Sequence, residues 1–221
     1  MQETHAYIEH RSDQLRGHPF FTALRPEPDL KRAMAFAPSA MFWVLSFQDM
    51  IRMNAELTQD PSLRQFVEQH LAEDTGHEKW FLEDLEHVFG SAPTKIDWLF
   101  SSENYRIRKI SFALASEVFR ASDDRLRPIV IDALEAGADV CLKRIAQNLV
   151  ESGHAGTLKY FAGMHLNAEA SHAMHSEQHK PQKLELPTHL REEAEALIDR
   201  MFEQFIALVD LMHERLEEGR A

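Results

Sequence analysis

Histidine and carboxylate residues recur in this sequence at a spacing that suits metal binding. The chain has 221 residues, of which 13 are histidine. On an α-helix, residues i, i+4 and i+7 lie on one narrow face, so three such side chains point the same way. Two segments have this His-x3-acid-x2-His pattern, 95 positions apart: His70, Asp74 and His77, then His165, Glu169 and His172. Two facing helices of this kind would supply four imidazoles and two carboxylates.

The spacing favours two metal ions over one. Residues i and i+7 are about 10 Å apart along a helix axis, which is long for two histidines on one ion. The span suits a central carboxylate that bridges two ions, each with its own histidine. Imidazole and carboxylate ligands suit Fe, Mn or Zn, and the ligand types leave these three metals open. Glu73 is an alternative to Asp74, and we expect His175 and His179 to be solvated at the end of a helix.

Helices account for nearly the whole pattern of the sequence. The 8 Gly and 9 Pro residues fall between periodic segments, and no run of residues alternates as a strand would. We therefore predict an all-α fold, a single helical domain over residues 1–221 that forms one compact bundle of about seven or eight helices. The expected helices cover residues 4–16, a short segment after Pro28, and residues 39–57, 61–89, 96–100, 105–122, 128–150, 156–179 and 191–218.

The composition excludes several classes of protein. The net charge of −12 and the pI near 5.5 argue against binding to nucleic acid or to anionic membranes, which attract basic surfaces. A single cysteine excludes a disulfide framework and sites with several thiolates. No segment has the length and apolar character of a membrane span or a signal peptide. We therefore expect a cytoplasmic protein.

Around these ligand segments the sequence resembles the haem-oxygenase-like di-metal oxidases, relatives of thiaminase II and of the coenzyme-PQQ synthesis oxidase. The resemblance lies in the acid-x2-His step within AEDTGHEKWF, in the later His-x3-acid-x2-His motif, and in HPFFTAL at residues 18–24. It implies a haem-oxygenase-like bundle of seven or eight helices. It also implies a di-iron site that activates O2 for attack on a small organic or acyl substrate.

The resemblance also implies further carboxylate ligands. One is usual on the helix before the second motif, where we select Glu135, with Asp139 and Glu117 as alternatives to it. Such proteins commonly have a glutamate on an early core helix, whereas residues 41–47 here read MFWVLSF. Asp49 is the nearest acid, and His70 is a second candidate for that place.

Our leading functional prediction is a metal-dependent, non-haem di-iron oxidase or oxygenase. We expect a small-molecule substrate and O2 as its partners, no nucleic acid or membrane, and a homodimer as a possible assembly. The alternatives are a metal-free, thiaminase-like pocket protein, for which Cys141 is the only candidate nucleophile, and a ferritin-like bundle that handles iron. Aromatic residues flank the ligand segments and are candidates for core packing or for an apolar pocket: Phe42, Trp43, Phe47, Trp80 and Phe81.

Overall fold

The computed structural model describes residues 2–154, 156–163, 165 and 185–219. Helix dominates these described residues, and no strand occurs among them. Within them, seven helices of 13 residues or more form the bundle: α1 (Gln2–Arg16), α4 (Met41–Leu57), α5 (Pro61–Asp74), α6 (His77–Phe89), α8 (Tyr105–Arg120), α9 (Arg127–Glu151) and α11 (Thr188–Glu218). The prediction of an all-α bundle of about seven or eight helices is confirmed.

Short helices and turns connect the long helices. The short α-helices are α2 (Pro19–Ala23), α3 (Leu30–Ala33) and α7 (Ile96–Leu99). Single turns of 3-10 helix lie at Ala37–Ala40, Ala92–Thr94, Ser102–Asn104 and Asp124–Leu126. Among the described helices, none is both long and apolar enough to cross a lipid bilayer.

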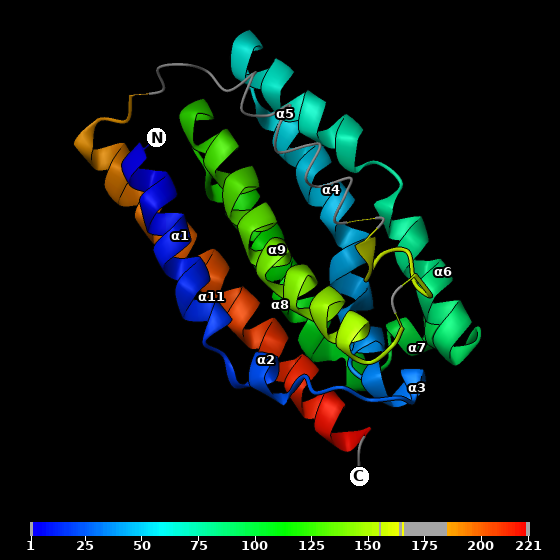
Figure 1. Cartoon of the computed structure of the whole chain (residues 1–221). Helices are drawn as coiled ribbons and strands as arrows, with labels where there is room; N and C mark the ends of the chain where they lie inside the picture. The colour runs from blue at the N-terminus through cyan, green and yellow to red at the C-terminus, as the bar shows by residue number, and fades with distance from the viewer. Residues whose placement is uncertain (1, 155, 164, 166–184, 220–221) are drawn as a thin grey trace.

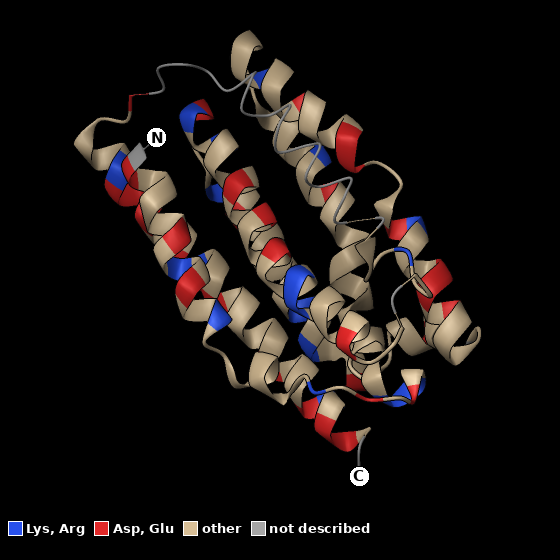
Figure 2. Ribbon diagram, in the orientation of Figure 1, with Lys and Arg blue, Asp and Glu red and all other residues tan. Residues whose placement is uncertain are grey.

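Helix α9 is the central element of the bundle. It packs against α1 and α11 on one side and against α4 and α5 on the other, as Figure 1 shows. Its sides are buried along most of its length, by residues such as Val130, Leu134 and Ile145. Charged positions occur along the helices, with acidic positions on most of them (Figure 2). Polar side chains that α9 turns toward the core therefore lie where side chains from several helices meet.

Local sequence signals set the start of α5. The Asp60 side chain accepts hydrogen bonds from the backbone N–H groups of Ser62 and Leu63, and Pro61 occupies the first helical position. Both features stabilise a helix N-terminus, because the cap satisfies free N–H groups and proline has none to satisfy. Asp60 and Pro61 are therefore local sequence signals for the start of α5.

The prediction of one helix over residues 61–89 is wrong. The chain leaves the helix after Asp74 and starts a new one at His77. Thr75 is extended, and Gly76 has a φ of 103°, a left-handed conformation that glycine adopts without the steric cost of a Cβ atom. His77 therefore does not share one continuous helix face with Asp74.

The prediction of a helix that starts at Gly156 is also wrong for its first part. Residues 156–162 form turns, and helical backbone is described only at Gly163 and His165. Gly156 has a φ of 81°. Backbone N–H groups of these turns donate to the Asp84 side chain on α6. They therefore do not form the hydrogen bonds of a helix that starts at Gly156. The rest of the predicted helix lies outside the described residues.

Helices α9 and α11 approach each other closely at Gly137. A Cβ atom at this position would lie 2.3 Å from the ring of Phe205, well inside van der Waals contact. Phe205 is fully buried and its ring also packs edge-on against Trp43. The absence of a side chain at Gly137 thus lets Phe205 fill the space between the two helices.

Candidate metal centre

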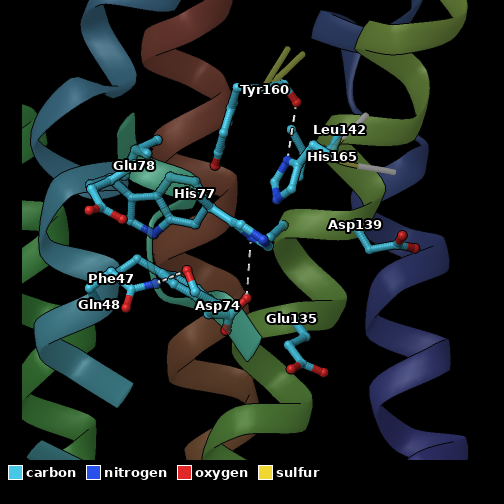
Figure 3. Close-up of a pocket in the computed structure, with 13 residues that line it drawn as sticks. Phe47, Gln48, Asp74, His77, Glu78, Glu135, Asp139, Leu142, Tyr160 and His165 are labelled. Carbon is cyan, nitrogen blue, oxygen red and sulfur yellow. Dashed lines mark hydrogen bonds and ion pairs between the residues drawn. The ribbon is translucent and has the colours of Figure 1, made fainter. Parts of the chain in front are cut away.

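A pocket with a volume of about 40 Å³ lies where α4, the α5–α6 junction, α9 and the turn at Tyr160 meet (Figure 3). This volume is enough for roughly three water molecules. Within the described part of the chain, the lining residues are Trp43, Val44, Phe47, Gln48, Asp74, His77, Glu78, Glu135, Ala138, Asp139, Leu142, Tyr160 and His165. The pocket therefore combines apolar walls with carboxylates and two imidazoles.

His77 and His165 meet in this pocket although 87 residues separate them in the sequence. Their ring centroids are 4.7 Å apart, and Figure 3 shows the two imidazoles directed toward each other. Nδ1 of His77 lies 3.6 Å from Oδ1 of Asp74, and its ring stacks on Trp80. All three polar side chains are buried. Two segments predicted from the repeated motif thus contribute to one site.

The backbone of the 156–163 turn selects the tautomer of neutral His165. Nδ1 of His165 lies 3.1 Å from the carbonyl oxygen of Tyr160, and because a carbonyl only accepts, Nδ1 is the donor. The ring also stacks on Tyr160, with 4.4 Å between centroids. In neutral His165 the Nε2 lone pair is therefore directed away from this bond. Metal-binding histidines are commonly held in this way, with the other ring nitrogen bound to a backbone carbonyl.

His70 pairs with Glu135 beside the pocket. Nδ1 of His70 lies 2.8 Å from Oε1 of Glu135, and the His70 side chain is 4 % exposed against 32 % for Glu135. Burial lowers the pKa of His70, but the hydrogen bond and charge of Glu135, together with the charges of Asp132 and Glu73, raise it by more, so the pKa lies above its ordinary value. Among the described residues, Nε2 of His70 is buried and has no hydrogen-bond partner. Glu135 thus connects His70 to the pocket wall.

Asp84 holds the 156–163 turn against α6. Its carboxylate accepts hydrogen bonds from the backbone N–H groups of Lys159 (2.8 Å), Tyr160 (2.8 Å) and Phe161 (3.2 Å). Burial raises the pKa of Asp84, against the lowering effect of these three donors. Asp84 lies two turns after His77 on α6. The Asp84 carboxylate therefore links α6, which contains His77, to the turn that precedes His165.

The structure brings together four of the seven predicted ligands and places a fifth next to them. Asp74, His77, Glu135 and His165 line the pocket, and His70 binds Glu135. Glu169 and His172 lie outside the described residues, as do His175 and His179.

The alternative carboxylates have other positions. Glu73 accepts a hydrogen bond from Gln69 and does not line the pocket, which favours Asp74. Asp139 lines the pocket and pairs with Lys143 at 2.7 Å. Glu117 is buried in α8, where Arg120 and Arg200 bind it. Asp49 is exposed and pairs with Arg52. Helix α4 therefore contributes no carboxylate to the pocket.

Three residues of the site were not predicted from the sequence. Gln48 donates a hydrogen bond to the backbone carbonyl of Asp74, the last residue of α5. Tyr160 orients His165, and Asp84 binds the turn around Tyr160. No spacing in the sequence distinguishes these residues, because each acts through a contact between distant segments.

The donor chemistry of the pocket fits a metal ion of the predicted kind. Imidazole and carboxylate side chains are the ligands that Fe, Mn and Zn take in proteins, and a histidine with its second nitrogen bound to a carbonyl is suited to ligation. Among the described residues alone, no group of three or more His, Cys, Asp or Glu side chains is placed to hold an ion. A complete ligand set would therefore need residues beyond the described part, where Glu169 and His172 belong.

Cys141 is a buried core residue. It does not line the pocket, and burial raises the pKa of its thiol to about 12. At about pH 8 only about one thiol in 10,000 would then be ionised. We expect no alkylation of the native protein by iodoacetamide and complete alkylation in urea, measured by mass spectrometry. Rapid alkylation of the folded protein would contradict the buried, protonated thiol.

The chain matches no family model, and no curated protein matches it at a significant level. Its function is therefore inferred from the residues of the pocket and their arrangement.

Proposed function

We propose that the chain is a metal-dependent oxidase or oxygenase, with two iron ions, that acts on a small organic or acyl substrate with O2. The observation that supports this most is the buried pair of His77 and His165 beside Asp74 in a pocket with aromatic walls. Buried imidazoles and carboxylates are costly unless they are paired or bind a cation. Their convergence from distant segments favours a binding site over ordinary core packing.

Each pocket residue has a distinct role in this proposal. Asp74, His77, Glu135 and His165 would hold the metal, together with Glu169 and His172. Iron, when bound in its reduced state, supplies the electrons that reaction with O2 requires. In the neutral form of His165 the proton is on Nδ1, which donates to the Tyr160 carbonyl, so the Nε2 lone pair would be available to a metal ion. Trp43 and Phe47 restrict water at the wall opposite α9.

The volume of the pocket limits what can enter it. About 40 Å³ accommodates a few atoms and not an entire organic molecule. We therefore expect that only the reacting end of the substrate reaches the pocket, while the remainder binds nearer its opening.

Two rival functions fit the geometry less well. A ferritin-like site uses an acid-x2-His pair on one continuous helix, whereas here α5 ends at Asp74 and α6 begins at His77. A thiaminase-like reaction needs a nucleophilic thiol in the pocket, and Cys141 is buried elsewhere.

Metal content tests the proposal directly. We expect tag-free protein, reconstituted anaerobically with Fe(II) and desalted, to retain iron by elemental analysis. His77→Ala should weaken metal binding by at least about tenfold, because it removes a ligand and leaves Asp74 without this neighbour. His10→Ala is the matched control, since His10 is exposed on α1, and it should retain iron as the wild type does. If neither the wild type nor the control binds Fe, Mn or Zn, the proposal fails.

A further inference from the structure

Helix α8 has a row of exposed aromatic side chains on its outer face. Tyr105, Phe112 and Phe119 are 60 %, 59 % and 62 % exposed, although large aromatic residues are usually covered. They are spaced by seven residues, which places them on one face of the helix. Lys109 and Ser116 complete this face, which we call the α8 stripe. The opposite face of α8 packs against α4 and α11, so the stripe is not part of the core.

The exposed apolar surface continues beyond α8. The ring of Phe42 packs edge-on against both Phe112 and Phe100, with centroids 5.4 and 5.9 Å apart. Phe100 is 58 % exposed, and Ile96, one turn before it in α7, is 77 % exposed. The exposed patch consists of five side chains: Ile96, Phe100, Tyr105, Phe112 and Phe119. If each exposes about 120 Å², the patch offers about 600 Å² per copy, or roughly 1,200 Å² in a pair. This is at the lower end of the area that stable interfaces bury.

We propose that the α8 stripe is the contact surface of a homodimer in which two α8 helices pack antiparallel across a twofold axis at Phe112. The spacing of the stripe is symmetric about this residue, with an aromatic side chain seven positions before it and another seven positions after it. In the antiparallel pair, Phe112 meets its own copy and Tyr105 meets Phe119 of the partner subunit. A surface that is complementary to itself is what a twofold interface requires.

Charge supports a second copy of the chain as the occupant. Arg120, whose side chain is 61 % exposed, lies eight residues after Phe112, and the exposed Glu103 lies nine residues before it. The antiparallel arrangement brings Arg120 of one copy near the partner's Glu103 at both ends of the stripe. Lys109 is the one charged residue of the stripe, so the surface that the two copies would share carries little of the charge that makes two chains of net charge −12 repel.

Analytical ultracentrifugation of the full chain tests this interface. We expect a reversible dimer for the wild type, and a monomer for Phe112→Asp, which would place two like charges in contact at the axis. Val150→Asp is the matched control, because Val150 is 63 % exposed and lies at the end of α9 outside the stripe. It should dimerise as the wild type does. Far-UV circular dichroism should show that all three proteins keep their helices.

Cysteine crosslinking fixes the geometry of the dimer. Phe112→Cys should form an intermolecular disulfide on mild oxidation, because the two copies of residue 112 meet at the axis. Tyr105→Cys should not, because the two copies of residue 105 would lie about 21 Å apart along antiparallel helices. The native Cys141 is buried and gives no background. A wild type that stays monomeric at every concentration, dimerisation of Phe112→Asp, or equal crosslinking by both cysteine variants would each overturn the proposal.

Discussion

Asp84→Ala is expected to lower the free energy of unfolding by about 3 kcal/mol or more. The substitution removes the only described acceptor of three backbone N–H groups, those of Lys159, Tyr160 and Phe161. A buried donor without a partner costs about 1–3 kcal/mol, and Tyr160 and Phe161 are buried. Urea denaturation followed by circular dichroism measures this change.

Two further variants separate the effect of losing these three hydrogen bonds from the effect of losing a negative charge on α6. Glu83→Ala removes the neighbouring carboxylate, which only pairs with Lys159 at the surface, and should cost no more than about 1 kcal/mol. Asp84→Asn keeps one acceptor oxygen and should fall between the two. If Asp84→Ala and Glu83→Ala have the same small effect, then Asp84 does not hold the turn.

Gly137→Ala is the second substitution for which we expect a large effect, a destabilisation of about 1–3 kcal/mol from overpacking. Alanine favours a helix over glycine by about 1 kcal/mol, so propensity alone predicts the opposite sign. The new Cβ would lie 2.3 Å from the ring of Phe205, which is fully buried and packs against Trp43 and Phe202. Thermal denaturation of the variant gives the sign directly.

A double-mutant cycle with Phe205→Leu tests the cause. The smaller side chain removes the ring atoms that the new Cβ would meet, so Gly137→Ala should cost less in this background than in the wild type. An unchanged cost would locate the strain elsewhere than at Phe205.

Much of the fold was predictable because it depends on local signals. Asp60 and Pro61 together specify the start of α5, and the side-chain cap in the structure is the one that their order predicts. The apolar stripe of α11, for example Leu197, Met201 and Phe205, predicts a long amphipathic helix, and these side chains are buried.

The break between α5 and α6 was not predicted, because the helical periodicity continues through it. His70, Asp74 and His77 have the spacing of one helix face, and this pattern outweighed the signal of Gly76. A glycine destabilises a helix by about 1 kcal/mol relative to alanine, but this cost alone does not determine whether the chain turns there. In the structure Gly76 is left-handed, and its backbone N–H donates to the Glu78 carboxylate at the start of α6.

Part of the candidate site was predicted, because its motif residues recur at a regular spacing. Repeated spacing identified Asp74, His77 and His165, which do line one pocket, and the choice of Glu135 over Glu117 agrees with their positions. The roles of Tyr160 and Asp84 depend on contacts between residues far apart in the chain. Such contacts leave no periodic trace in a single sequence.

The three hydrogen bonds of Asp84 also determine when the pocket can form during synthesis of the chain. Its bonds to Lys159, Tyr160 and Phe161 close loops of 75 to 77 residues, and the contact between His77 and His165 closes a longer one. Contacts of such high sequence separation must overcome a large entropy of loop closure before they form. A nascent chain that has left the ribosome only as far as α9 can bury much of the α4 and α5 surface. It still lacks the histidine and the turn that complete the pocket.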